Sequence, residues 1–574
     1  MLVSITYVLF SVFVFALADE GDLKTQAWRT TAPSGVPPQS YPETELLKDK
    51  PNTAIAFSGG GSRSYVASMG ELAALTQLGL MDKVRYVAGI SGGSWATLTY
   101  SFSQNDADGG DDVLLGPITA PGDLTSANLK EMDPGCARGF ASSDVTGHTL
   151  KGYKSGTAMG EAWSNAVSQA YLEPVGIQPE DYFTVSPDSE SDIKARNPSL
   201  GDAHFVHLAN AKRPFPIVAS TLVGPSEFMP YRTDNHNYSY CEITPMYVGQ
   251  MRERLVSYHS PQKLKFRRST GVQQVGGAVE PFAVGVKAAV GPTEGVPDGQ
   301  STATLDIPPP SQHLDLRFAA GASGYAPGSF VESTFSEKLK DTSLFMSYWS
   351  PASAQPEPVE NVWADGGSTD NLLLMGLLQR KVSSIVLFSN CHQPLQPSDK
   401  WDVTTDPYST TSISDDLGFY FGVTPDDYKR SAPRFVNYEV TQVFSADDWP
   451  GWVQGLQASQ AEGNGIVYTA TLTTIQNDLW GIPAGLEVTL TTVYLGRSLN
   501  WEAQLPEELQ ALVVPQDPEA ATNPAETVGD GPYKDFPHYA TTGGMLSHER
   551  ANLLAQLTAF QVLEHKDIFE KVLS

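Results

Sequence analysis

The stretch Val84-Arg-Tyr-Val-Ala-Gly-Ile-Ser-Gly-Gly-Ser-Trp95 decides the fold that the sequence predicts. Its first half is apolar, as a buried strand would be, and small residues follow at once. Within it, Gly89-Ile-Ser91-Gly-Gly93 has the G-x-S-x-G form of a nucleophile elbow. Such an elbow is a sharp turn from a strand into a helix, and it lifts the serine oxygen clear of the backbone. The residues whose small size would let the turn close are Gly89, Gly92 and Gly93.

A glycine triplet lies just upstream, in Ser58-Gly-Gly-Gly-Ser-Arg63. It follows a second apolar run, Ala54–Phe57, and precedes a predicted helix from Ser64 to Leu78. Backbone N–H groups at the start of a helix attract negative charge, so those of Gly60 and Gly61 could hold an oxyanion. The two motifs fall within one stretch of the size of a βαβ unit, and together they predict a catalytic site.

An aspartate far downstream completes this predicted site. In Val362-Trp-Ala-Asp-Gly-Gly367, Asp365 stands between an apolar run and two glycines, ahead of a helix-like segment over 371–380. A carboxylate at a strand end can take the proton of a serine directly, without a histidine between them. Taken singly, the aspartate could be only a helix N-cap and the glycine motifs only tight turns. The occurrence of all three motifs in this order favours catalysis.

These motifs resemble the catalytic domain of cytosolic phospholipase A2 and the fungal lysophospholipases (phospholipase B), within the wider patatin-like acyl hydrolases. The similarity covers Asn52–Ser101, Phe215–Gly249 and Asn361–Ser389. Two departures are Ser64, where the family usually has alanine, and an Asp-Gly-Gly motif closer to the patatin form. The resemblance implies the following roles: Ser91 as nucleophile, Asp365 as base, Gly60 and Gly61 as oxyanion donors, and Arg63 as the residue that holds the substrate phosphate or the transition-state charge.

The resemblance also implies a reaction and a substrate. Hydrolysis of a fatty-acyl ester of a glycerophospholipid or lysophospholipid would need no cofactor and no metal, and the ten histidines show no spacing typical of metal ligands. Arg63 directly follows the glycine loop, where a guanidinium adds two directed donors that lysine lacks. A surface salt bridge is the alternative role for Arg63. We expect it to serve the substrate's charge rather than the fold.

The fold implied is α/β with three layers, a mainly parallel central sheet and the serine at the C-terminal end of a strand. A polar lead-in without a core is expected over residues 19–50. One catalytic domain is expected over 51–574. Its loop or cap insertions are predicted at about 102–214, 265–350 and 392–545.

Composition limits the partners. Of the 574 residues, 41% are hydrophobic and 18% are charged, which is typical of a globular protein. The net charge of −28 argues against nucleic acid binding and against strong electrostatic docking on anionic membranes. Contact with a lipid surface would then rely on exposed apolar residues. The oligomeric state stays open.

The first residues predict the localisation of the protein. Met1–Ala18 is apolar and ends in Ala16-Leu17-Ala18, which is typical of a cleaved signal peptide. Secretion or residence in the lumen of the secretory pathway is therefore expected. The alternative is membrane attachment by an uncleaved signal anchor, because no lysine or arginine precedes Lys24.

Three other functions remain open at this point. A conventional Ser-His-Asp esterase could use a remote histidine such as His392 or His538. A phosphate-binding module could use the glycine loop, although the G-K-[ST] ending of a P-loop is missing. A catalytically inactive lipid-binding homologue would keep the fold alone, and the intact serine and aspartate argue against it.

Overall fold

The computed structural model describes residues 22–29, 41–104, 110–229, 238–259, 270–286, 291–326, 341–409, 411–423, 441–540 and 545–574. The predicted signal peptide over residues 1–18 lies outside these ranges. Among the described helices, none combines the length and the hydropathy that a bilayer crossing requires.

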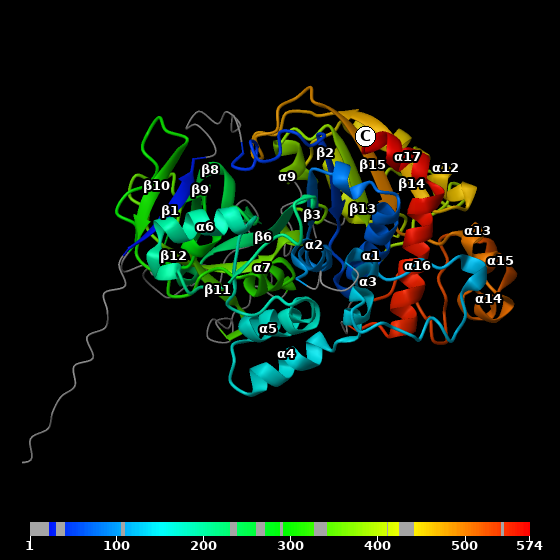
Figure 1. Cartoon of the computed structure of the whole chain (residues 1–574). Helices are drawn as coiled ribbons and strands as arrows, with labels where there is room; N and C mark the ends of the chain where they lie inside the picture. Colours follow the sequence, from blue (N-terminus) through cyan, green and yellow to red (C-terminus); the bar gives the residue numbers. More distant parts are fainter. Residues whose placement is uncertain are drawn as a thin grey trace, which may run out of the picture.

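A large mixed sheet runs through the molecule, and its centre is parallel (Figure 1). Each adjacent pair among the five central strands is parallel. In spatial order these strands are β6 (Phe215–Pro225), β3 (Tyr86–Gly89), β2 (Thr53–Phe57), β13 (Ser384–Ser389) and β15 (Glu487–Tyr494). Most of their residues are buried, as expected of strands covered on both faces. The prediction of an α/β fold with a parallel central sheet is confirmed.

Antiparallel strands extend the sheet on both sides of this centre. On one side, β14 (Ile466–Thr473) pairs with β15. On the other side, beyond β6, follow β7 (Ser239–Ile243), β8 (Val248–His259), β9 (Thr270–Val279), β1 (Leu23–Trp28) and β10 (Thr302–Ile307). β12 (Val359–Asp365) also pairs with β6, and β11 (Leu344–Tyr348) pairs with β12.

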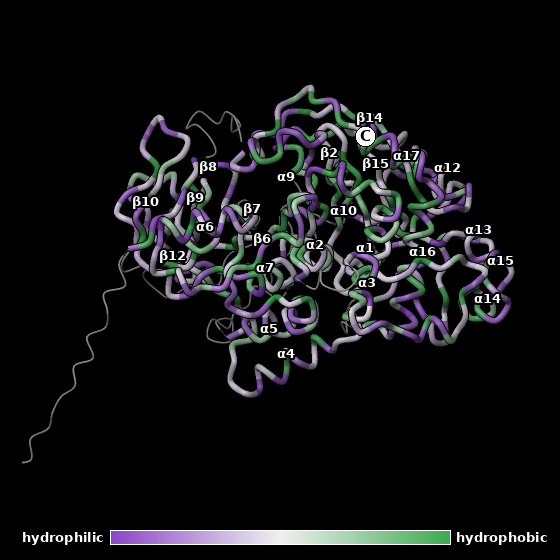
Figure 2. The backbone as a smooth tube through the Cα atoms, viewed as in Figure 1, coloured by the Kyte–Doolittle hydropathy of each residue, from purple (hydrophilic) through white to green (hydrophobic). Residues whose placement is uncertain are grey.

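Helices cover both faces of the sheet and give three layers. The side chains of β2 alternate between two hydrophobic cores, with Ile55 and Phe57 on one face and Ala54 and Ala56 on the other. The first core is closed by α1 (Gly61–Gln77), α2 (Gly92–Phe102), α7 (Leu316–Ser323) and α16 (His548–Glu564). The second is closed by α9 (Leu374–Gln379) and α12 (Trp449–Glu462). Hydrophobic residues follow the central strands and these helices (Figure 2).

The structure describes further helices and one separate pair of strands. The helices are α3 (Gly110–Leu115), α4 (Val145–Lys154), α5 (Met159–Tyr171), α6 (Pro187–Arg196), α10 (Asp415–Gly418), α13 (Leu499–Glu502), α14 (Glu507–Val513), α15 (Pro518–Thr522) and α17 (Lys566–Val572). β4 (Tyr182–Phe183) and β5 (Phe205–Val206) form a separate parallel pair.

Two parts of the predicted domain organisation are wrong. The lead-in over 19–50 contributes strand β1, which pairs with β10 and β9 and buries Leu23 and Ala27. The predicted insertions over 265–350 and 392–545 contribute β9, β10, β11, β14 and β15, all of which are strands of the main sheet. Residues 271–328 are rich in glycine and proline, and this composition made the segments that form β9 and β10 resemble irregular loops.

Candidate active site

Ser91 lies at the turn between β3 and α2, as the elbow motif predicts. Its φ and ψ angles are 51° and −121°, a conformation that residues with a side chain rarely adopt. Such backbone strain costs about 1–3 kcal/mol and persists only where surrounding contacts enforce it. The elbow is therefore held by its neighbours, and Ser91 keeps only 9% of its surface exposed.

The glycines around Ser91 fill a space with no room for side chains. A methyl group on Gly89 would lie 2.4 Å from the carbonyl oxygen of Gly93, and one on Gly93 would lie 2.4 Å from that of Phe57. Gly92 packs in the same way against the backbone of Gly61. The elbow and the glycine loop are thus in direct backbone contact, and each fixes the position of the other.

The glycine loop enters α1 with two left-handed residues. Gly60 has φ 142° and Gly61 has φ 56°, which only glycine adopts without strain. Gly59 donates its N–H to the carbonyl oxygen of Asn371 at 3.0 Å. Within the described ranges, the N–H groups of Gly60 and Gly61 have no acceptor. These two donors are available to an anion at the start of the helix, beside the elbow.

Asp365 ends strand β12, and its side chain meets Ser91. The carboxylate accepts a hydrogen bond from the backbone N–H of Gly367 at 2.8 Å, and the Ser91 side chain lies close enough to interact with it. Burial raises the pKa of Asp365 to about 6, although the neighbouring Gly367 N–H and Ser91 side chain act to lower it. The structure thus brings together a serine hydroxyl and a carboxylate that come from opposite halves of the chain.

The histidines named as alternatives do not join this pair. His538 is buried and its Nδ1 lies 3.1 Å from the carbonyl oxygen of Cys391, and burial lowers the pKa of this imidazole to about 3. Burial also lowers the pKa of His392. Among the described residues, no histidine hydrogen-bonds to Ser91 or Asp365.

Arg63 lies beside the glycine loop but is tied to the fold. Its Nε donates to the carbonyl oxygen of Asn390 at 3.0 Å, and its Nη1 donates to that of Tyr539 at 2.6 Å. Burial lowers the pKa of the guanidinium to about 10. Nη2 lies against Gly60, 2.8 Å from where a methyl group on that residue would be. The expectation that Arg63 does not serve the fold is therefore wrong.

The sequence did not predict two hydrogen bonds near the site. The backbone N–H of Ser91 donates to Oγ of Ser323 at 3.1 Å, and the Nδ2 of Asn371 donates to Asp416 at 2.6 Å. The amide oxygen of Asn371 fills the space beside Gly59. Asn371 begins the helix-like segment that the sequence predicts after the aspartate motif, whereas nothing in the sequence around Ser323 indicates its position.

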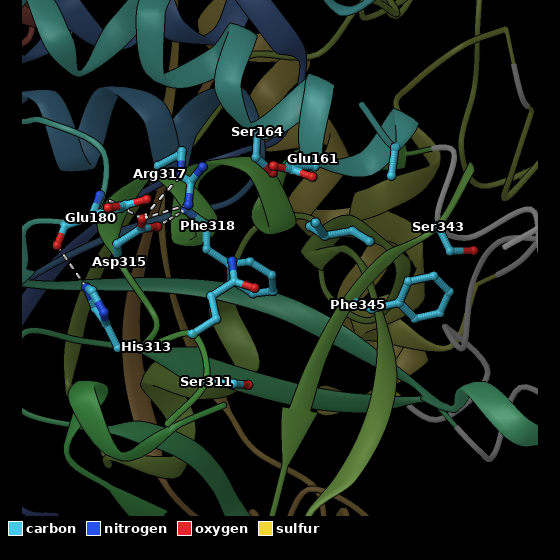
Figure 3. Close-up of a pocket in the computed structure, with 13 residues that line it drawn as sticks. Glu161, Ser164, Glu180, Ser311, His313, Asp315, Arg317, Phe318, Ser343 and Phe345 are labelled. Atoms are coloured by element: carbon cyan, nitrogen blue, oxygen red, sulfur yellow. Dashed lines mark hydrogen bonds and ion pairs between the residues drawn. The ribbon is translucent and has the colours of Figure 1, made fainter. Parts of the chain in front are cut away.

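A cavity with a volume of about 560 Å³ lies at the N-terminal end of α7 (Figure 3). Asp315 caps α7 there and accepts a hydrogen bond from Arg317. Neither Ser91 nor Asp365 lines it. In the described part of the chain, no three His, Cys, Asp or Glu side chains gather as metal ligands would.

The known proteins that this chain is similar to belong to the families that the motifs resemble. The family model described as "Lysophospholipase catalytic domain" matches residues 53–106, which contain the glycine loop and the elbow. Lysophospholipase 1 of Candida albicans is 25% identical over 424 residues, which cover 67% of this chain and 60% of that protein. Cytosolic phospholipase A2 zeta of Mus musculus is 25% identical over 201 residues, 35% of this chain and 20% of that protein. Cytosolic phospholipase A2 gamma of Mus musculus is 39% identical over 64 residues, 11% of each.

A solved structure, human GIVD cytosolic phospholipase A2, aligns over 92% of this chain and 62% of its own, with 12% identity and a TM-score of 0.43. The matched segments cover less than two thirds of each of these relatives. The residues matched by the family model include both the glycine loop and the elbow. The chain therefore resembles the catalytic domains of cytosolic phospholipase A2 and the lysophospholipases.

Proposed function

We propose that this protein is a serine acyl hydrolase that cleaves fatty-acyl esters of glycerophospholipids or lysophospholipids through a Ser91–Asp365 dyad. The single observation that carries the proposal is that the Ser91 side chain, on a strained elbow, lies next to the Asp365 carboxylate. The lipid substrate is taken from the resemblance to phospholipases, because the residue chemistry alone specifies only an ester.

The chemistry follows from the arrangement. Asp365 takes the proton of Ser91 as Oγ attacks the ester carbonyl carbon, and the carbonyl oxygen becomes an oxyanion. The free N–H groups of Gly60 and Gly61 stabilise this charge, and one such donor is typically worth about 3–4 kcal/mol. The tetrahedral intermediate then collapses, the bond to the leaving alcohol breaks, and Asp365 returns the proton to that alcohol.

In the second half of the reaction, water replaces Ser91 as the nucleophile. Asp365 takes a proton from a water molecule that attacks the acyl-serine, and the fatty acid leaves as Ser91 regains its proton. The Nη2 of Arg63 faces the glycine loop and makes no hydrogen bond to the described residues, so it can contact the phosphate or the oxyanion. Every step uses side chains and backbone groups of this chain.

Two rival functions have less support. A Ser-His-Asp esterase would need a histidine in contact with the serine, and none of the described histidines has that contact. A catalytically inactive homologue would have no need to maintain a strained serine beside an ionisable carboxylate.

Covalent trapping tests the proposal. The purified protein is treated with a fluorophosphonate probe, and the modified peptide is mapped by mass spectrometry. We expect the adduct on Ser91 in the wild type and no adduct in Ser91→Ala. The matched control is Ser101→Ala in helix α2, which begins at the elbow. The Ser101 hydroxyl is buried and has no hydrogen-bond partner among the described residues, so its loss should leave labelling unchanged.

Hydrolysis of phospholipid and lysophospholipid micelles is measured on the same samples. Ser91→Ala should lose all hydrolysis without a change in melting temperature, because only the nucleophilic oxygen is removed. More than a few per cent of the wild-type rate in that variant would exclude the dyad.

We further propose that residues 1–18 direct the protein to the secretory pathway. The proposal is supported by the apolar run and by the Ala16-Leu17-Ala18 sequence at its end. The N-terminus of the protein recovered from expressing cells should be Asp19. Recovery of Met1 in the membrane fraction would instead indicate an uncleaved anchor.

A further inference from the structure

The C-terminal end of α7 contacts both residues of the dyad. The backbone N–H of Ser91 donates to Oγ of Ser323 at 3.1 Å, and the backbone N–H of Asp365 donates to the carbonyl oxygen of Tyr325, also at 3.1 Å. We call the segment Ser323–Tyr325 the α7 clamp. It lies far from Ser91 in the sequence, and it accepts one hydrogen bond from each half of the proposed catalytic pair.

The amide of Ser91 needs this acceptor. Strand β3 ends at Gly89, so the N–H of Ser91 has left the parallel ladder that pairs the preceding residues. A buried N–H without an acceptor costs about 1–3 kcal/mol. Ser323 is fully buried, and its hydroxyl reaches the amide in the positive-φ conformation that the elbow imposes.

The clamp is itself fixed to the helix that begins at the elbow. Carbonyl groups in the last turn of a helix lack partners within that helix. In α7 the indole N–H of Trp95 donates to the carbonyl oxygen of Ala320 at 3.0 Å, and that of Trp163 donates to Gly321 at 3.1 Å. Gly324 lies so close to Trp95 that a methyl group on it would be 2.8 Å from the ring. Because Trp95 belongs to α2, α7 and the elbow hold fixed positions relative to each other.

We propose that Ser323 is a positioning residue for Ser91: it holds the elbow in the rotation that points the serine oxygen at Asp365. The inference rests on the proposed function, in which Ser91 is the nucleophile. The hydrogen bond of Ser323 is to the backbone N–H of Ser91, so in this proposal it acts on the orientation of the nucleophile and not on proton transfer. Tyr325 holds the strand end that carries Asp365 in the same way, through its carbonyl oxygen.

The test compares Ser323→Ala with Ser164→Ala. Ser164 is also buried, packs against Gly321 of α7, and donates its hydroxyl within its own helix to Gly160 at 3.1 Å. It shares the environment of α7 without touching the dyad. Ser323→Ala should lower kcat about tenfold, equivalent to about 1.4 kcal/mol. KM and the number of sites titrated by a fluorophosphonate should stay unchanged. Ser164→Ala should leave all three at wild-type values.

A second measurement does not depend on activity. Hydrogen exchange followed by mass spectrometry reports on the peptide that contains Ser91, and its protection should fall in Ser323→Ala but not in Ser164→Ala. Ser323→Cys keeps nearly the same volume with a weaker acceptor and serves if the alanine variant does not fold. It should give a kcat between those of the wild type and Ser323→Ala.

The outcomes separate this inference from the function on which it rests. If the wild type is not labelled by the probe, the proposed function fails, while the exchange experiment still decides whether Ser323 holds the elbow. If Ser323→Ala retains the wild-type kcat, or loses rate only in proportion to titrated sites, Ser323 is not a positioning residue. Unchanged protection of the Ser91 peptide would overturn the inference by itself.

Discussion

The side chain of Ser91 lies next to the carboxylate of Asp365, in a site where burial dominates the electrostatics of that carboxylate. Burial raises the pKa of Asp365 to about 6, and the interactions with Gly367 and Ser91 only partly oppose this. A general base must be ionised to take a proton, and it works best when its pKa lies near the working pH.

The first prediction is therefore a pH profile. With a neutral nitrophenyl ester as substrate, kcat/KM should rise with pH, with an apparent pKa of about 6, and should level off above it. The measurement is the initial rate from about pH 4 to 9 at constant ionic strength. A midpoint near the usual aspartate value of about 3.9 would mean that the carboxylate is not desolvated as the structure indicates.

The second prediction concerns the stability of Asp365→Asn. Since the folded-state pKa lies above the unfolded value of 3.8, the stability associated with this group is full below pH 3.8 and is lost as pH rises through about 6. The ionised form of the buried carboxylate thus destabilises the fold by about 3 kcal/mol. Asparagine has no charge to bury, so the variant should be inactive but more stable than the wild type at pH 8.

Urea unfolding at several pH values checks this sign. The difference between Asp365→Asn and the wild type should shrink as the pH falls toward about 4, where both side chains are neutral. Asp402 serves as the control because it is exposed and hydrogen bonds from Thr404 lower its pKa. Asp402→Asn should therefore not stabilise the protein. A wild type that is more stable than Asp365→Asn at pH 8 would contradict the prediction.

The third prediction tests the contact between elbow and loop. A methyl group on Gly92 would stand 2.0 Å from the carbonyl oxygen of Gly61, and backbone on both sides leaves no flexible side chain to move aside. Gly92→Ala should abolish hydrolysis and lower the free energy of unfolding by at least about 2 kcal/mol. Gly451→Ala is the control, because Gly451 lies in helix α12 with open space around it. It should be neutral or slightly stabilising in urea unfolding.

Much of the central layer could be predicted from the sequence. The strands β2 and β3, the turns that follow them and the start of α1 and α2 carry strong local signals, namely apolar runs that end in glycine. The elbow and aspartate motifs together predicted that Ser91 and Asp365 lie close to each other. The same motifs contain Gly61 and Gly92, whose backbones are in contact.

The parts that could not be predicted depend on contacts between distant segments. Strand β1 lies in a polar stretch and acquires its place by pairing with β10 and β9. Ser323 is one serine among many, and only the packing of α7 on α2 brings it to Ser91. Arg63 was expected to face the substrate alone because the carbonyl groups of Asn390 and Tyr539 are contributed by segments with no recognisable motif.

The fourth prediction is that hydrolysis does not require a metal ion. The proposed mechanism assigns proton transfer to Asp365 and charge stabilisation to backbone N–H groups, so no step depends on a cation. Hydrolysis of phospholipid vesicles with an excess of EDTA should equal the rate without it. Complete loss of hydrolysis that is restored by added Ca²⁺ would contradict this mechanism or indicate a cation needed for contact with the vesicle.

The fifth prediction separates the two roles of Arg63. Its Nε and Nη1 hold two backbone carbonyl oxygens, and its Nη2 lies against Gly60 of the loop. The single nitrogen of lysine cannot serve all three places. Arg63→Lys should therefore lower the free energy of unfolding by about 1–3 kcal/mol. It should also reduce hydrolysis of phospholipid more than hydrolysis of nitrophenyl butyrate, which brings no phosphate to the site.

Arg138→Lys is the matched control for this variant. Arg138 is likewise buried, and it donates to the carbonyl oxygens of Leu115 and Pro117 at 2.8 Å each. Its replacement should lower stability to a similar extent while leaving the ratio of the two hydrolysis rates at the wild-type value. If Arg63→Lys also leaves that ratio unchanged, the guanidinium acts on the fold or on the oxyanion common to both substrates. The proposed contact between Arg63 and the substrate phosphate would then be wrong. An equal loss of stability in both variants, with a changed ratio only for Arg63→Lys, would establish that one guanidinium supports both the fold and the substrate.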